Sequence, residues 1–305
     1  MSSYSSASCR GRANVMTGWH AVSSVLTSER AFPRVARSGL SWPKLAAAFV
    51  VGLWLFPVYW IVLTSLKPIK EINSAVPSFI FSPTAENYRE LFTKFDFARV
   101  LMNSLVITFV SCFVVLVLGV PAGYALARMK VPGEKQIALW ILSLRFLPPI
   151  AVAIPFYILW QDLNLLDTYV GMILIYVAFN LPFAIWMMRG FLADVPVALE
   201  EAALLDGLTR LQIILRVVVP VVMPGIASTA IFTFVFMWNE YLMALMLTAF
   251  KSVTVPVTIA KFVEPYTVLW GTLSAAVVIQ VVPMLVVVFL LQRHIVRGLT
   301  LGAVK

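Results

Sequence analysis

The sequence predicts an all-α polytopic membrane protein with six transmembrane helices and a helix–turn–helix in the loop between spans four and five. Hydrophobic residues make up 61% of the 305 residues, charged residues make up 12%, and the mean hydropathy is +0.93. A soluble domain is about half apolar and about a quarter charged, and disordered chains are richer in charge still. The composition therefore excludes both a soluble globule and a disordered chain.

The six predicted spans are apolar stretches of at least the ~20 residues that a helix needs to cross a bilayer. Strands of a membrane β-barrel are shorter, about ten residues, and alternate in polarity, so helices are the better interpretation. Prolines interrupt the third, fourth and sixth spans, and we expect such broken helices to be buried or to line a cavity. The spans cover residues 45–66, 100–127, 137–160, 168–188, 223–249 and 268–292.

The distribution of Lys and Arg predicts that both termini lie in the cytoplasm. With the N-terminus inside, 15 cations fall on the cytoplasmic side and seven on the external side. Cytoplasmic loops of membrane proteins carry an excess of Lys and Arg. We attribute the net charge of +9 to these loops, which face anionic lipid, and not to nucleic-acid binding.

Four segments follow from this topology. Residues 1–43 are predicted to be a disordered cytoplasmic leader, with a transit peptide or a later start at Met16 as alternatives. Residues 44–99 hold the first span and an external loop, in which an amphipathic stretch around Tyr88 and Leu91 forms an interfacial helix or a cap. Residues 100–293 hold spans two to six, and residues 294–305 form a cytoplasmic tail.

The loop 194–220 is the least membrane-like part of the second half of the chain. Asp194 is a candidate N-cap, Gly207 is a candidate helix stop, and Thr209 is a candidate cap for a second helix that runs to Pro220. The first helix carries four acids from Asp194 to Asp206 and no cation. A helix on an anionic membrane surface usually has a basic polar face, so we interpret this acidic helix as a contact for a partner protein.

The same loop carries the motif of a known family. Binding-protein-dependent ABC importer permeases have Glu-Ala-Ala, three residues, Gly, nine residues and Ile-x-Leu-Pro in this position. This chain resembles them, with Val in place of Ile and Leu, and further similarity to the smaller, maltose-type membrane subunit of carbohydrate importers covers residues 44–305. The matching residues are Glu201, Ala202, Ala203, Gly207, Val217, Val219 and Pro220.

The resemblance implies a non-catalytic permease subunit in the bacterial cytoplasmic membrane. A phosphate-binding loop would end in Gly-Lys-Ser or Gly-Lys-Thr, and no Gly in this chain precedes Lys. ATP and Mg²⁺ are therefore expected on two separate ATPase subunits, with no cofactor on this chain. The other expected partners are a second homologous permease, an external solute-binding protein, a sugar and membrane lipid. The residues expected to couple to the ATPase are Glu201, Ala202, Ala203, Asp206, Gly207 and Pro220.

Polar residues inside the spans are candidates for the path of the substrate. Arg145 is expected to line a cavity, to pair with Glu240, or to extend to the cytoplasmic interface. Asn180 is expected either to line the path or to form a hydrogen bond between two helices. Trp238, Asn239 and Glu240 combine an aromatic face with polar groups, which suits a sugar, but an interfacial aromatic belt is the alternative. Gln280 and the pair Gly119 and Gly123 are expected to serve packing.

Two other function classes stay open. An ion-gradient-driven secondary transporter would use Arg145 and Glu240, but it gives no reason for the acidic helix of the loop. An ABC permease for amino acids or peptides is the nearest alternative within the family. His20 and His294 are the two histidines and lie far apart in the sequence, so a metal site has no support.

Overall fold

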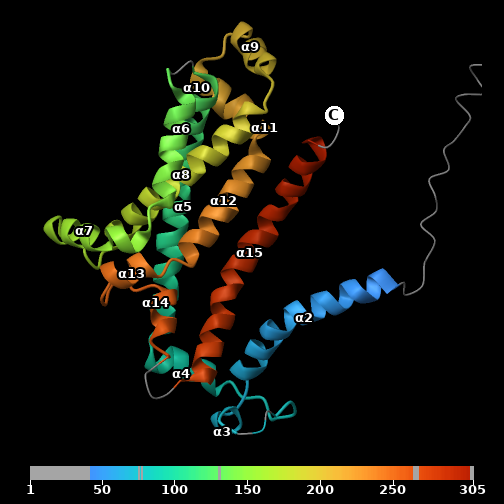
Figure 1. Ribbon diagram of the computed structural model, residues 1–305, viewed down its shortest axis with the longest axis vertical. Helices are drawn as coiled ribbons and strands as arrows, with labels where there is room; N and C mark the ends of the chain where they lie inside the picture. Colours follow the sequence, from blue (N-terminus) through green and yellow to red (C-terminus); the bar gives the residue numbers. More distant parts are fainter. Residues whose placement is uncertain (1–41, 75, 77, 130–131, 264–267, 303–305) are drawn as a thin grey trace, which may run out of the picture. The chain divides into compact units, whose positions relative to one another are not determined.

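The computed structural model describes residues 42–74, 76, 78–129, 132–263 and 268–302 (Figure 1). These residues form helices joined by turns, with an isolated β-bridge between Val263 and Val268. The all-helical class predicted from the sequence is therefore confirmed. The predicted leader 1–43 lies outside the described residues apart from its last two.

The chain divides into two compact units, Met1–Phe56 and Pro57–Lys305. In the first unit the described residues form the beginning of α2 (Trp42–Ser65), a 24-residue helix that ends in the second unit. Its sequence is almost entirely apolar, and Lys44 near its start is its one charged residue. This composition matches the first predicted span.

The second unit holds the remaining helices, which follow one another along the chain as short and long segments. They are α3 (Ile69–Ile72), α4 (Glu86–Lys94), α5 (Phe97–Arg128), α6 (Glu134–Ser143), the 3-10 turn η1 (Leu144–Phe146), α7 (Pro149–Asp162), α8 (Tyr169–Ala193), α9 (Val197–Leu205), α10 (Arg210–Ile213), the π-helical turn η2 (Ile214–Val218), α11 (Val219–Val221), α12 (Met223–Trp238), α13 (Leu242–Leu247), α14 (Val255–Ala260) and α15 (Trp270–Gly302).

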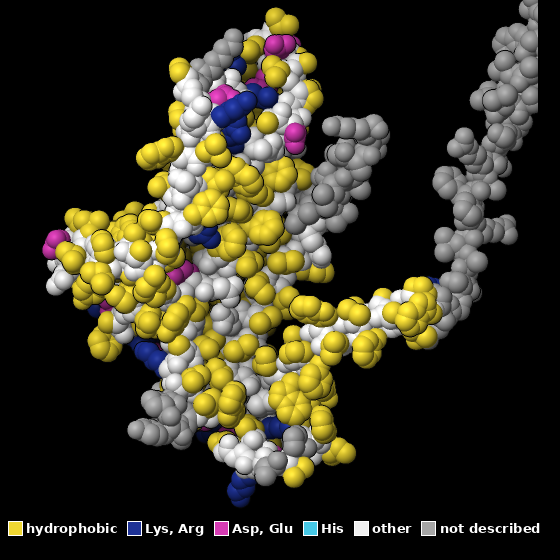
Figure 2. Space-filling view, viewed as in Figure 1, with side chains coloured by type: hydrophobic (Ala, Val, Ile, Leu, Met, Phe, Trp, Pro, Cys, Tyr) yellow, Lys and Arg dark blue, Asp and Glu magenta, His cyan; other side chains and the backbone are white. Residues whose placement is uncertain are grey.

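Four of the described helices are long and apolar enough to cross a membrane, namely α2, α5, α8 and α15, and the number rises to six if each of two bent helix pairs is one span. Hydrophobic side chains cover the middle of the second unit, whereas charged side chains gather around α9 and α10 (Figure 2). This distribution is the one expected of a polytopic membrane protein.

The predicted third span is not one straight helix. Glu134–Phe146 and Pro149–Asp162 meet at an angle of 87°. The cause is local, because Pro148 and Pro149 follow Leu147, and a residue before proline is disfavoured in the α conformation. Leu147 and Pro148 accordingly have extended ψ angles of 120° and 122°.

The predicted fifth span, 223–249, is wrong in its boundaries. α12 ends at Trp238, and the chain turns before it enters α13. The Glu240 carboxylate accepts hydrogen bonds from the amides of Met243 and Ala244, at 2.9 and 3.0 Å, and so caps the new helix. The bent pair that could form a span is instead Arg210–Val221 with Met223–Trp238, at 79°.

The packing of α5 against α8 forms the centre of the second unit. A methyl group at Gly123 would lie 2.8 Å from the Met188 Cβ, and one at Gly119 would lie 3.2 Å from the Ala184 Cβ. The two helices therefore approach more closely than larger residues would allow. The expectation that this glycine pair serves packing is confirmed.

α4 confirms the amphipathic helix predicted in the loop 67–99. Its Leu91 is fully buried, and the Asn87 side chain donates hydrogen bonds to the carbonyls of Ser65 and Lys67 at 2.9 and 2.8 Å. Asn87 also lies so close to Gly271 that a Cβ there would meet its Oδ1 at 2.2 Å. The helix is thus fixed between the end of α2 and the start of α15.

Candidate functional site

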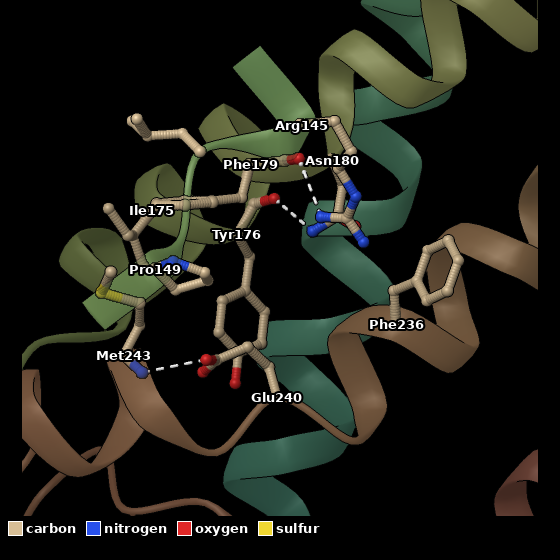
Figure 3. A pocket seen from close by; sticks show the side chains of 10 residues that line it. Arg145, Pro149, Ile175, Tyr176, Phe179, Asn180, Phe236, Glu240 and Met243 are labelled. Carbon is tan, nitrogen blue, oxygen red and sulfur yellow. Dashed lines mark hydrogen bonds between the residues drawn. The ribbon is translucent and has the colours of Figure 1, made fainter. Parts of the chain in front are cut away.

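A cavity of about 340 Å³ lies where two broken helices meet the middle of α8 (Figure 3). One wall comes from the break between α6 and α7, another from the end of α12 and the start of α13. Helix breaks at membrane depth are tolerated where they line a cavity, and transporters commonly place their substrates there. The lining residues are Arg145, Leu147, Pro149, Ile175, Tyr176, Phe179, Asn180, Phe236, Glu240 and Met243.

Arg145 lies at the edge of this cavity. Its Nη1 donates a hydrogen bond to the Phe179 carbonyl at 3.1 Å, and its guanidinium carbon lies 4.7 Å from the centre of the Phe236 ring. The ion pair with Glu240 considered from the sequence is not among the salt bridges of the described residues. A guanidinium has five N–H donors, so Arg145 keeps donor capacity for a ligand.

Asn180 supplies an acceptor to the same cavity. Its side chain is buried, and its Nδ2 donates to the Tyr176 carbonyl at 2.8 Å within the same helix. Its Oδ1 is buried without a hydrogen-bond partner. A buried acceptor that lacks a partner costs free energy, and a ligand hydroxyl in the cavity would remove that cost.

Glu240 lines the cavity, but its two predicted neighbours do not. Trp238 is 2% exposed, stacks on Phe234 and donates its Nε1–H to the Gln280 carbonyl at 2.9 Å, so it belongs to the helix packing. The Asn239 side chain bonds back to the Val235 carbonyl at 2.8 Å. Of the five candidate path residues, the structure brings together Arg145, Asn180 and Glu240.

The loop 194–220 has the predicted order of helix, glycine turn and helix. Gly207 has φ of +83°, the left-handed conformation that ends α9. The Thr209 side chain and Gln212 form a reciprocal capping box at the start of α10. Asp194 is not the N-cap of α9 as predicted, because Pro196 occupies that position without a side-chain cap.

The second helix of the loop was predicted to run to Pro220 and ends one residue later, at Val221, but it widens into the π-helical turn η2 before Pro220. The ring of a proline inside a helix collides with the carbonyl four residues earlier, and a wider turn relieves that collision.

The predicted coupling residues divide between the two faces of α9. Glu201, Ala202, Asp206 and Gly207 are exposed, as is Pro220 further along, whereas Ala203 is buried in the cluster around Tyr124 and Met188. Leu205, next to Asp206, is 90% exposed.

Glu200 was expected to face a partner with the other acids, and this expectation is wrong. It is 3% exposed and turns into the protein, where its Oε1 accepts from the Arg128 Nε at 2.7 Å. Its Oε2 accepts from the Tyr124 hydroxyl at 2.6 Å. Arg128 also donates to the Val195 carbonyl. The resemblance assigned the coupling role to Glu201, but the residue types alone could not separate two adjacent glutamates.

Asp167 is a second residue that the sequence reasoning missed. Its carboxylate accepts hydrogen bonds of 2.9–3.1 Å from the amides of Ala249–Ser252 and from the Ser252 hydroxyl. Burial alone would raise the pKa of the Asp167 carboxyl, but these backbone amides lower it to about 2. Asp167 thus binds the segment between α13 and α14 to the start of α8.

In the described part of the chain, no group of three His, Cys, Asp or Glu side chains could hold a metal ion. The polar groups of the cavity are hydrogen-bond donors and acceptors among aromatic rings. This arrangement can bind and orient a polar solute.

Comparisons with known proteins agree with this architecture. The chain is 38% identical over 279 residues to the trehalose transport system permease protein SugB of Mycobacterium tuberculosis, covering 88% of this chain and 99% of the relative. It is 35% identical over 270 residues to the diacetylchitobiose uptake system permease protein DasC of Streptomyces coelicolor, covering 88% and 98%.

The fold is also found in a solved structure. It matches a chain of a bacterial ABC transporter involved in the import of the acidic polysaccharide alginate, with a TM-score of 0.69, 21% identity and coverage of 96% of this chain and 99% of that chain. Residues 119–301 match the family described as binding-protein-dependent transport system inner membrane component. The chain therefore belongs to this family, the multi-pass inner-membrane permease subunits of ABC importers.

Proposed function

We propose that this chain forms part of the path by which a sugar crosses the membrane, in an importer driven by separate ATPase subunits. The observation that carries the proposal is the cavity at the two helix breaks. Arg145 offers donors, and the Asn180 Oδ1 and Glu240 offer acceptors. Phe179, Phe236 and Tyr176 add aromatic surface. Sugars have many hydroxyls and apolar ring faces, so they fit this mixture.

The relatives support a sugar as the substrate. SugB is named for trehalose and DasC for diacetylchitobiose, and both align over nearly their whole length. An amino-acid or peptide permease remains the alternative to be tested. A secondary transporter is disfavoured by the family, and it would leave the acidic face of α9 without a purpose.

We further propose that α9 is the coupling helix that docks on an ATPase subunit. Its exposed face combines Glu201 and Asp206 with Ala202 and Leu205, so acidic groups stand beside apolar surface. An exposed apolar patch with charged neighbours is typical of a protein contact site, and the acids would pair with basic groups of the partner. Gly207 and Pro220 set the path of the chain after this helix.

The proposed assembly contains this chain, a second homologous permease, two ATPase subunits and an external solute-binding protein. The chain itself is proposed to bind no cofactor and to catalyse no reaction. It would cross the membrane six times, counting each bent helix pair as one span, with both termini in the cytoplasm. This orientation places α9 on the cytoplasmic side and Asp167 on the external side.

The experiment that tests this function is uptake by the reconstituted complex. We expect proteoliposomes with ATP inside and binding protein outside to accumulate a labelled disaccharide. Uptake should persist when ionophores collapse every ion gradient, and it should stop without ATP. Leucine and a tripeptide serve as competing substrates for the alternative. Accumulation by this chain alone, driven by an ion gradient, would refute the proposal.

Within that assay, Arg145→Gln and Asn180→Leu test the cavity. Each variant removes a polar group that faces the cavity, so we expect weaker uptake with normal assembly. Asn239→Leu is the matched control, because its amide bonds within its own helix and does not line the cavity. Equal uptake by all three variants would contradict the role of the cavity.

A further inference from the structure

Glu200 joins α9 to the end of α5 by a buried, charge-assisted contact. Both carboxylate oxygens are used, one by Arg128 at 2.7 Å and the other by Tyr124 at 2.6 Å. The side chains of Arg128 and Glu200 are 12% and 5% exposed, which shields the ion pair from water and salt. We call Tyr124, Arg128 and Glu200 the α9 clamp.

The α9 clamp holds one face of α9 against the protein and leaves the opposite face exposed. Ala203, one turn after Glu200, is buried with Tyr124 and Met188, whereas Glu201 and Leu205 are exposed. A buried ion pair that is broken on one side leaves an uncompensated charge, so the contact resists separation. A force applied to the exposed face of α9 must therefore also act on α5.

The opposite end of α5 carries a second set of buried polar contacts. Asn103 is 1% exposed, and its Nδ2 donates to the carbonyls of Lys251 and Val253, both at 2.9 Å. The Ser104 hydroxyl accepts from the Val255 amide at 2.7 Å. Tyr169 from α8 donates its hydroxyl to the Asn103 Oδ1. We call the contacts of Asn103 and Ser104 the α14 clamp, because they hold the residues that begin α14.

Between the two clamps α5 is a continuous helix of 32 residues, although it contains Pro121. Asn103 and Arg128 are 25 residues apart, which corresponds to about 37 Å along the helix axis. Figure 1 shows α5 reaching from the region of α10 to the region of α4. At Gly119 and Gly123 the helix lies in close contact with its partner α8, without large side chains between them.

We propose that α5 is a connecting rod between the two sides of the importer, with Arg128, Glu200 and Asn103 as positioning residues. The α9 clamp would pass the movement of the ATPase subunits to α5, and the α14 clamp would pass it to residues 249–255. That segment is external in the proposed orientation and would meet the solute-binding protein. The inference rests on the proposed function, because it assigns the ATPase to α9.

The connecting rod makes a specific prediction about two distant variants. Glu200→Gln weakens the α9 clamp, and Asn103→Asp removes the donor of the α14 clamp. Each should reduce the stimulation of ATPase activity by the sugar-loaded binding protein by about fivefold or more, within the usual range of coupling between sites. Once one clamp is broken, α5 no longer links the two sides, so breaking the other clamp has little further effect on the stimulation. The double variant should therefore lose no more stimulation than the more strongly impaired of the two single variants.

The measurement uses the complete reconstituted complex with its binding protein. For each variant we record the amount of copurified ATPase, the unfolding temperature, and the sugar taken up per ATP. We also record the ATPase activity with and without the sugar-loaded binding protein. Glu134→Gln is the control for Glu200→Gln, because it breaks the more exposed 3.6 Å ion pair with Arg189. Asn164→Asp is the control for Asn103→Asp, because Asn164 is exposed and Asp tolerates its positive φ of 54°. Both controls should keep the full stimulation.

Losses that multiply in the double variant would overturn the connecting rod, because independent structural defects combine in that way. Unchanged stimulation in both single variants would overturn it as well. If the Glu200→Gln variant fails to assemble, Tyr124→Phe takes its place in the single and the double variant. Tyr124→Phe removes one hydrogen bond of the α9 clamp at nearly constant side-chain volume. A wild-type complex whose sugar uptake does not depend on ATP would instead refute the proposed function, so the failure of the proposed function and the failure of the connecting rod are distinguishable.

Discussion

The contact between α5 and α8 yields a prediction whose size follows from the structure. In Gly123→Ala the new methyl carbon would lie 2.8 Å from the Met188 Cβ and 3.0 Å from the Arg189 backbone nitrogen. Ordinary contact begins at 3.4 Å, so the Cβ–Cβ distance is about 0.6 Å too short. Rotation of a side chain cannot relieve a clash with a Cβ or with backbone, and α5 and α8 must separate. Overpacking of this kind costs about 1–3 kcal/mol.

Gly190→Ala is the matched control for this prediction. Gly190 lies in α8 and is exposed, and an added Cβ there has no atom within 4 Å. Both variants gain the same helix propensity, up to about 1 kcal/mol, so their difference isolates the packing cost. Gly119→Ala, with 3.2 Å to the Ala184 Cβ, should fall between them.

The assay is the unfolding temperature of the purified complex in detergent, measured together with its yield. We expect the order Gly190→Ala, Gly119→Ala, Gly123→Ala from most to least stable. If Gly123→Ala unfolds at the same temperature as Gly190→Ala, the close approach of the two helices is not a tight contact, and the packing argument is wrong.

Four further predictions concern single positions. Because the folded pKa of Asp167 is about 2, below its ordinary 3.8, its stabilisation is complete above about pH 4 and disappears as the pH falls towards 2. The protection of the Ala249–Ser252 amides from hydrogen exchange, relative to the intrinsic exchange rate at each pH, should fall over that window, and Asp167→Asn should lower this protection already at pH 7. Gly207→Pro should leave the chain in the membrane but abolish ATP-coupled uptake, since proline cannot adopt a φ of +83°, and normal uptake would argue against the turn. Glu201→Lys should lower the amount of ATPase that copurifies, because it reverses a charge on the exposed face of α9; unchanged assembly would remove Glu201 from the contact. Asn180→Asp should weaken sugar uptake less than Asn180→Leu, since it keeps an acceptor in the cavity, and the reverse order would contradict a hydrogen bond from the substrate to this side chain.

Much of the architecture could be predicted from the sequence because hydropathy and chain length dominate it. α2, α5, α8 and α15 begin and end within a few residues of the predicted spans, apart from the C-terminal extension of α15. Gly207 and Thr209 also took the predicted roles, since a left-handed glycine and a capping threonine are decided by their immediate neighbours.

The break between α12 and α13 could not be predicted in this way. The stretch 223–249 is apolar apart from a few residues such as Asn239 and Glu240, and two polar residues in a span-length stretch do not by themselves predict a turn. The turn depends on the Glu240 carboxylate, which binds two backbone amides instead of a side chain. The position of Trp238 against Gln280 likewise depends on α15, far along the chain.

The polar contacts between distant segments were the least predictable part of the site. Asp167 binds backbone amides more than 80 positions later, and backbone amides leave no signature in a sequence. The pairing of Glu200 with Arg128 needs the fold to bring α9 onto α5. The sequence contains both charges, and the family motif assigns a role to Glu201, but neither indicates that Glu200 lies against Arg128.

The inward turn of Glu200 has a practical consequence for the engineering of hybrid importers. A chimera that receives only residues 194–220 from this chain would carry Glu200 into a host that need not offer Arg128 and Tyr124. A charge left alone in such a place typically costs about 3–5 kcal/mol, enough to prevent folding before any question of ATPase choice arises. The transferable module is therefore the loop together with the last turns of α5.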